Sequence, residues 1–198
     1  MIKKISLFLA KEVALNDETN DNQEIYAYGF EIVINSLISI ILVLIIGLLK
    51  HDVLNALIYL VVYCSIRICA GGYHANNNFT CILIFVLAYM FSFVCVQIFT
   101  EPIVAFTIIC MVFCVVCFLA PVDTPENPIL PCERKVLKKK AIIRTVLVSI
   151  LILSNIVFEL KLKISGSYAA LSYIGIVLLA GELKNRRYKH EKNKKENI

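Results

Sequence analysis

Four long stretches of this chain contain no Asp, Glu, Lys or Arg. They are Ile32–Leu49, Phe79–Thr100, Pro102–Val122 and Ile164–Gly181. An uncharged apolar run of about 18 residues or more can cross the hydrocarbon core of a bilayer as a helix. The composition agrees, because hydrophobic residues make up 59% of the chain and charged residues 18%, against about 45–50% and about 25% in soluble domains. The sequence therefore predicts an all-α, polytopic integral membrane protein.

Two further segments are apolar except near their ends. Val53–Ala70 carries Arg67, and Ala141–Leu160 carries Arg144 and Glu159. Long charged side chains near the end of a span can extend to the membrane interface. We therefore expect about six transmembrane helices.

We expect one membrane-embedded domain over residues 1–198, with a transmembrane core at 25–183 and a basic tail at 184–198. The remaining segment, residues 1–24, begins with apolar side chains at helical spacing. These are Ile2, Ile5, Phe8, Leu9 and Val13. The spacing predicts an amphipathic helix on the inner leaflet, although the same residues could form a simple leader to the first span.

The positive charges indicate how the chain is oriented. If the N-terminus is cytoplasmic and there are six spans, all but three of the 20 Lys and Arg residues fall on the cytoplasmic side. The exceptions are Lys50, Lys161 and Lys163. This bias follows the positive-inside rule. We expect a multi-pass protein of the cell membrane with both termini, and the connector between the second and third spans, in the cytoplasm.

The eight cysteines do not suggest a disulfide framework, because most of them lie inside predicted spans. Cys114 and Cys117 have the spacing of a redox or zinc motif, but they lie within a span with no histidine nearby. We expect no metal, no cofactor and no nucleic-acid partner.

The stretch RICAGGYHANNNFTC, from Arg67 to Cys81, interrupts the apolar runs with polar and reactive residues. Its two glycines should end the second span. Its three asparagines disfavour a new helix before Phe79. His74 should therefore lie in a short connector, and Cys81 in the first turn of the third span.

A cysteine at a helix start is chemically favoured as a nucleophile. The positive end of the helix dipole favours a thiolate, and free N–H groups there could stabilise an oxyanion. If the connector folds back, His74 can act as the base for Cys81. The alternative is a packing cysteine and an interfacial histidine. Arg67, a charge within a span, is either functional or an interfacial anchor.

The string formed by Arg67, Gly71, Gly72, His74 and Cys81 resembles the signature of the accessory gene regulator B family. These proteins are membrane cysteine endopeptidases of Gram-positive bacteria that process quorum-sensing propeptides. The segment Ala120–Ile129 and the basic run after it are similar to the family's Ala-Pro…Pro-Ile segment and basic cytoplasmic loop. The resemblance covers essentially the whole chain.

The resemblance implies that Cys81 is the nucleophile and His74 the base. It also implies supporting roles for Arg67, Gly71 and Gly72. The substrate would be an autoinducer propeptide lying on membrane lipid. Cleavage near its C-terminus would leave a thioester on Cys81, and an internal cysteine or serine would displace the enzyme to give a thiolactone or lactone. A homodimer is implied as well.

Other residues are weaker candidates for the same site. Asp123 could orient His74 or simply be solvated in its loop. Glu31 could pair with Arg67 or reach the interface. A basic loop at Arg134–Lys140 could bind an acidic leaving segment or only follow the positive-inside rule. Its three candidate residues are Lys138, Lys139 and Lys140.

The alternative function is a small membrane transporter or peptide exporter without proteolytic chemistry. Six helices and a charge within a span would suit one. Against it, the chain has no GxxxxGK[ST] phosphate-binding loop. Its second half also has no counterpart of the Gly-Gly-x-His string, as an inverted repeat would require.

Overall fold

The computed structural model describes residues 2–14, 23–73, 77–94, 102–123, 129–158 and 164–196. Helices occupy most of them. They are α1 (Ile2–Ala14), α2 (Gln23–Leu49), α3 (Val53–Ala70), α4 (Asn78–Val94), α6 (Pro102–Leu119), α7 (Pro131–Val157) and α8 (Ser165–Glu196). Within the described ranges, the β-pairing is limited to one bridge between Gly71 and Val122. The all-α prediction is confirmed.

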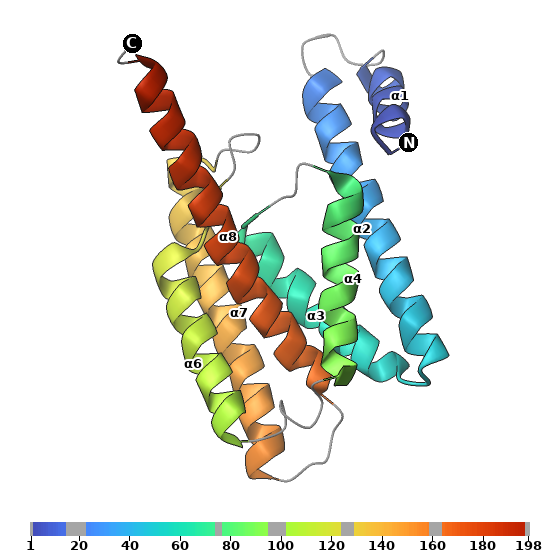
Figure 1. Cartoon of the computed structure of the whole chain (residues 1–198), viewed down its shortest axis with the longest axis vertical. Helices are drawn as coiled ribbons and strands as arrows, with labels where there is room; N and C mark the ends of the chain where they lie inside the picture. The colour runs from blue at the N-terminus through green and yellow to red at the C-terminus, as the bar shows by residue number, and fades with distance from the viewer. Residues whose placement is uncertain are drawn as a thin grey trace.

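Five described helices are long and apolar enough to cross a membrane, namely α2, α3, α6, α7 and α8. The sixth apolar helix, α4, has 17 residues. The six alternate in direction, so the chain ends marked N and C lie at the same end of the bundle (Figure 1). Large apolar side chains such as Ile41, Ile103 and Leu147 face outward. An apolar exterior of this kind fits a multi-pass membrane protein.

The central element of the bundle is α8. Within its membrane-spanning window 67% of the residues are buried, against 17–44% in the other four long helices. It packs against α3, α4 and α6. At its start, the backbone N–H of Gly166 donates a 2.7 Å hydrogen bond to Asn55 Oδ1 of α3. This bond satisfies one of the N–H groups that a helix start leaves unpaired.

The basic segment before the fifth predicted span is not a loop. Residues Arg134–Lys140 form the first turns of α7, which begins with Pro131 at its N-terminal position. Proline suits the first turn because its missing N–H would be unpaired there, and Lys and Leu are good helix formers. The basic tail is also mostly helical, because α8 continues to Glu196. The prediction of a loop at Arg134–Lys140 was wrong.

The third predicted span corresponds to α4 as far as Val94. Residues 95–101, which include the rest of that predicted span, lie outside the described residues.

The predicted N-terminal helix is confirmed as α1, which packs along α2 (Figure 1). Its buried residues are small: Ser6, Ala10 and Ala14. Small residues allow two helices to approach closely. The apolar residues Ile5 and Phe8 are exposed, which leaves an apolar face available to lipid. Location of α1 on the inner leaflet stays a prediction.

Candidate active site

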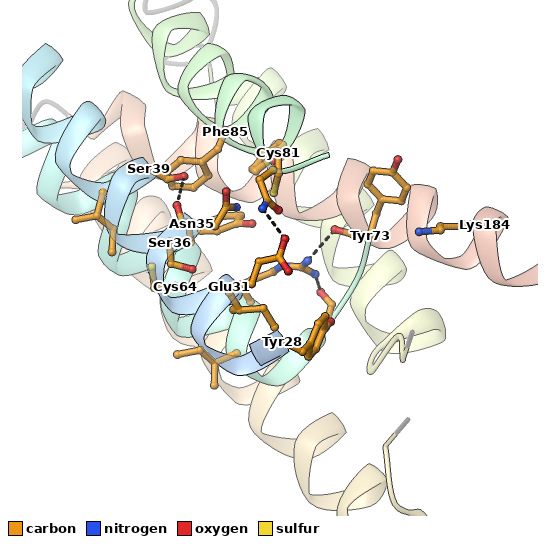
Figure 2. A pocket seen from close by; sticks show the side chains of 18 of the residues that line it. Tyr28, Glu31, Asn35, Ser36, Ser39, Cys64, Tyr73, Cys81, Phe85 and Lys184 are labelled. Carbon is orange, nitrogen blue, oxygen red and sulfur yellow. Dashed lines mark hydrogen bonds between the residues drawn. The ribbon is translucent and has the colours of Figure 1, made fainter. Parts of the chain in front are cut away.

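A cavity of about 670 Å³ lies among α1, α2, α3, α4 and α8. Its size falls within the range usual for ligand-binding pockets. Figure 2 shows side chains of α2, α3, α4 and α8 converging on it. Lining residues that matter here are Lys3, Glu31, Asn35, Ser39, Tyr63, Arg67, Cys81, Phe85, Tyr173 and Lys184.

Cys81, the predicted nucleophile, is a half-buried free thiol that lines this cavity. It lies in the first turn of α4, as expected. Asn77 organises that turn: its Oδ1 accepts a 3.1 Å hydrogen bond from the Phe79 N–H, and its carbonyl accepts one of 3.1 Å from the Cys81 N–H. Asparagine is a preferred N-cap residue for this reason. Those two N–H groups are therefore already used, and an oxyanion would have to find other donors.

Arg67 closes the end of α3. Its guanidinium donates hydrogen bonds to the carbonyl oxygens of three consecutive residues: Gly71, Gly72 (3.3 Å) and Tyr73 (2.8 Å). The last carbonyls of a helix lack partners within the helix, and a cation is favourable there. The charge within the span thus holds the turn that leads toward His74.

The double glycine is required by backbone geometry. Gly71 has φ +65° and Gly72 has φ +120°, conformations that residues with a Cβ rarely adopt. A Cβ on Gly71 would also collide with the carbonyl oxygen of Val122, and one on Gly72 with the Arg67 guanidinium. Hydrogen bonds from Gly72 N–H to Val122 O (3.0 Å) and from Val122 N–H to Ala70 O (2.9 Å) hold the turn against the segment after α6.

Tyr73 makes three interactions with α3 and α8. Its carbonyl accepts the bond from Arg67, its N–H donates a 3.0 Å hydrogen bond to Val177 O of α8, and its ring lies 5.3 Å from Lys184 Nζ. The last contact is a cation–π interaction. His74 itself lies outside the described residues. The structure therefore defines the chain up to the residue before the predicted base.

Glu31 lines the cavity opposite the start of α4. Its Oε1 accepts a 2.6 Å hydrogen bond from Asn78 Nδ2 (Figure 2). The ion pairs between described residues do not include one between Glu31 and Arg67. Glu31 instead joins α2 to the first residue of α4, one turn before Cys81.

Asp123 belongs to the segment that supports the glycine turn. Its carboxylate lies 3.8 Å from the Arg134 guanidinium, and its carbonyl accepts a 2.7 Å hydrogen bond from Asn185 Nδ2. Arg134 also donates to Pro121 O at 3.3 Å. These contacts tie the segment to α7 and α8. Orientation of His74 by Asp123 stays a prediction.

The lysines of the basic run lie on α7 and do not line the cavity. They are Lys138, Lys139 and Lys140. The described cations that do line it are Lys3, Arg67 and Lys184. An acidic substrate segment would therefore meet cations from α1, α3 and α8 at the cavity itself.

Comparison with known proteins identifies the family. The family model described as Accessory gene regulator B matches residues 2–183. The chain belongs to the accessory gene regulator B family. An AgrB-like protein of Clostridium perfringens (strain SM101) is 32% identical over 204 residues, covering 90% of this chain and 95% of that protein. AgrB-like protein 2 of Clostridium perfringens (strain 13) is 31% identical with the same coverage.

A third relative matches a shorter part of this chain. The AgrB-like protein of Halalkalibacterium halodurans is 33% identical over 88 residues, which cover 44% of this chain and 45% of that protein. No solved structure matches the chain. Membership of the accessory gene regulator B family implies a part in processing a quorum-sensing peptide. The family resemblance expected from the sequence is confirmed.

One wall of the cavity, formed by polar residues of α2, was not predicted from the sequence. Asn35 and Ser39 were not singled out, although with Glu31 they recur every four residues along an otherwise apolar helix. That spacing places all three on one face of α2, and polar residues within a span usually face the protein interior. Tyr63 and Tyr173 carried no comparable signal, because only packing of α3 against α8 brings their rings to 5.3 Å.

Proposed function

We propose that this chain is a membrane cysteine endopeptidase that cleaves the C-terminal part of an autoinducer propeptide and promotes its cyclisation. The nucleophile is Cys81 and the general base is His74. The observation that carries the proposal is the cavity that holds Cys81, together with the turn that Arg67 and two glycines build directly before His74. Tyr73 and Asn78, on either side of the undescribed residues 74–76, both line that cavity.

The first half of the reaction forms an acyl-enzyme. The Cys81 sulfur, having passed its proton to His74, attacks the carbonyl carbon of one peptide bond. The tetrahedral intermediate collapses as the C–N bond breaks. His74 returns the proton to the departing amine. The C-terminal segment leaves with a new amino terminus, and the rest of the propeptide stays on Cys81 as a thioester.

The second half closes the ring. A cysteine or serine within the bound peptide attacks the thioester carbonyl, the C–S bond to Cys81 breaks, and the Cys81 thiol is regenerated. The product is a thiolactone or a lactone. Exchange between a thiol and a thioester is nearly balanced in energy, so cyclisation succeeds only where water is kept from the acyl-enzyme.

Positively charged residues at the cavity could bind the C-terminal segment that leaves after cleavage. Lys3 and Lys184, which line the cavity, could attract an acidic segment. The run of lysines on α7 is a second candidate: Lys138, Lys139 and Lys140. Lys184→Gln should weaken substrate binding more than glutamine at the three α7 lysines, because Lys184 lines the cavity and those three lysines do not.

We infer the orientation from the positive charges and from the six apolar helices of the described residues, α2, α3, α4, α6, α7 and α8. We place both termini and the cavity mouth on the cytoplasmic side, where a propeptide made in the cell lies on the membrane lipid. A homodimer stays a prediction.

Intact-mass spectrometry tests the proposal. The protein in lipid nanodiscs is incubated with an autoinducer propeptide from the same organism, with Cys81→Ala as the control. We expect an adduct of the peptide's N-terminal part on the wild type only, released by hydroxylamine, which cleaves thioesters. If the peptide binds both proteins and neither is acylated nor cuts it, the alternative of a transporter or exporter without chemistry is favoured.

A further inference from the structure

The cavity extends deeper into the bundle than Cys81. Because α2 and α4 run in the same direction (Figure 1), the hydrogen bond between Glu31 and Asn78 aligns the two helices. About one turn further along, at about 1.5 Å rise per residue, come Asn35 on α2 and Cys81 on α4. About another turn along come Ser39 and Phe85. All of these residues line the cavity.

The deep part, which we call the inner chamber, is lined by Asn35, Ser39, Tyr63, Phe85 and Tyr173. One wall is aromatic: the Tyr63 ring lies 4.8 Å from that of Phe85 and 5.3 Å from that of Tyr173. The opposite wall, on α2, is polar. The inner chamber thus combines an apolar surface with a few polar groups, as ligand pockets do.

Asn35 has unused hydrogen-bonding capacity. Its Oδ1 is shielded from solvent and has no hydrogen-bond partner in the part of the chain that the structure describes. Figure 2 shows Asn35 and Cys81 projecting into the same space from α2 and α4. A buried carboxamide oxygen without a partner is unfavourable unless a ligand supplies a donor.

We infer that the inner chamber binds the acyl part of the peptide substrate, the residues just before the scissile bond, with Asn35 hydrogen-bonding their backbone. This inference rests on the proposed function. Two structural features support it: the carboxamide oxygen of Asn35, which has no partner among the described residues and lies beside the nucleophile, and an aromatic wall that suits an apolar side chain.

The spacing of the polar wall suits an extended peptide. Residues four apart on a helix are about 6 Å apart along its axis, and alternate residues of an extended chain are about 6.6 Å apart. The Ser39 hydroxyl donates its hydrogen to the Asn35 carbonyl (2.9 Å), so it can only accept from a peptide N–H. With Ser39 as an acceptor, Asn35 and Ser39 can meet alternate residues of one strand. A carboxamide offers both a donor and an acceptor, which matches the two polar groups of a peptide unit.

Charge assigns the inner chamber to the acyl part rather than to the leaving segment. The guanidinium of Arg67 is bound to the carbonyls of residues 71–73, and the other charged residues that line the cavity are Lys3, Glu31 and Lys184. We place the exit of the leaving segment to water beside these three charges. The thioester must stay where water is scarce. The end of the cavity beyond Cys81, farthest from these charges, meets that need.

The test is peptide binding to the Cys81→Ala protein, which measures affinity without chemistry. Two labelled synthetic peptides serve as probes: an autoinducer propeptide from the same organism, and the same peptide without its acidic C-terminal segment. We expect Asn35→Leu to weaken both by about tenfold, the value of one good hydrogen bond. Lys184→Gln should weaken only the longer peptide. Thr107→Val, on the lipid-facing side of α6, should weaken neither.

Thermal unfolding distinguishes a binding role from a structural one. Asn35→Leu should unfold at or above the wild-type temperature, since it removes a carboxamide oxygen without a partner, and Asn35→Gln should restore part of the affinity. Unchanged binding of both peptides by Asn35→Leu would overturn the inference. So would lost binding that tracks a lower unfolding temperature, or no peptide binding by the Cys81→Ala protein.

Failure of the proposed cysteine chemistry can be distinguished from failure of peptide binding in the inner chamber. If the wild type forms no thioester while the Cys81→Ala protein still binds the shorter peptide through Asn35, the inner chamber stands as a peptide site and the cysteine chemistry does not.

Discussion

The main chain of Gly71 lies directly against the main chain of Val122, although α4 and α6 separate them in the sequence. The bridge holds the turn after α3 against the segment after α6. Because residues 71–73 also bond to Arg67, and Tyr73 to α8, three parts of the chain determine where the connector carrying His74 begins.

Gly71→Ala should disrupt this arrangement. The new methyl group would overlap the Val122 carbonyl, and the positive φ would cost about 1–2 kcal/mol more for alanine than for glycine. We expect propeptide processing to fall at least about tenfold and the unfolding temperature to fall by several degrees. Gly29→Ala is the matched control, since nothing lies within 4 Å of its added methyl group. Equal effects of the two substitutions would show that the turn does not require glycine at position 71.

Arg67→Lys should not substitute for arginine. The planar guanidinium reaches the carbonyls of Gly71, Gly72 and Tyr73 together, whereas an ammonium is a compact charge without that fork. Loss of even one charged hydrogen bond costs about 1.5–3 kcal/mol. We expect at least about a tenfold loss of processing, measured by mass spectrometry of the product. Arg186→Lys, at an exposed ion pair with Glu182, should process normally. Full activity of Arg67→Lys would show that only the charge matters.

Asn78→Asp should make processing depend on pH in a new way. It would place a second carboxylate 2.6 Å from that of Glu31, where the present amide donates a hydrogen bond. Two carboxylates this close repel when both are ionised, and protonation of one restores a hydrogen bond. The processing activity of the variant, divided by that of the wild type at the same pH, should be lowest near pH 8 and rise toward pH 5. In the double variant Glu31→Gln/Asn78→Asp this trend should vanish, and a persistent trend would exclude the pair as its cause.

A water-soluble alkylating reagent should distinguish the cysteines. Cys81 lines the cavity and Cys132 is exposed near the start of α7, whereas Cys69 is buried. We expect labelling of Cys81 and Cys132 and none of Cys69, read by peptide mass spectrometry. Saturating propeptide should protect Cys81 but leave Cys132 reactive. Protection of both, or of neither, would argue against substrate binding in the cavity.

Much of the candidate site could be predicted because local sequence determines it. Gly71 and Gly72 end α3 wherever it packs, since few other residues adopt their backbone conformations. Asn77 and Asn78 begin α4 for a similarly local reason. Arg67 stood out because a charge within a span needs partners, although which carbonyls it would bind was not evident.

The predictions failed or stayed incomplete where distant segments meet. The basic run before the fifth span was expected to be a loop, because positive charge marks membrane sides without specifying helix or loop; it is the start of α7. Glu31 was expected either to pair with Arg67 or to reach the interface, and its partner proved to be Asn78 on another helix. The polar wall formed by Asn35 and Ser39 was not predicted, because its place beside Cys81 depends on how α4 packs against α2.

Hydrophobic length and glycine stereochemistry act locally, so they were enough to predict a helical membrane protein whose apolar runs are interrupted at Arg67–Cys81. Which groups face Cys81 could be learned only from the packed helices. Those choices depend on how α2, α3, α4 and α8 pack, and packing joins residues far apart in the chain through contacts that no local pattern records.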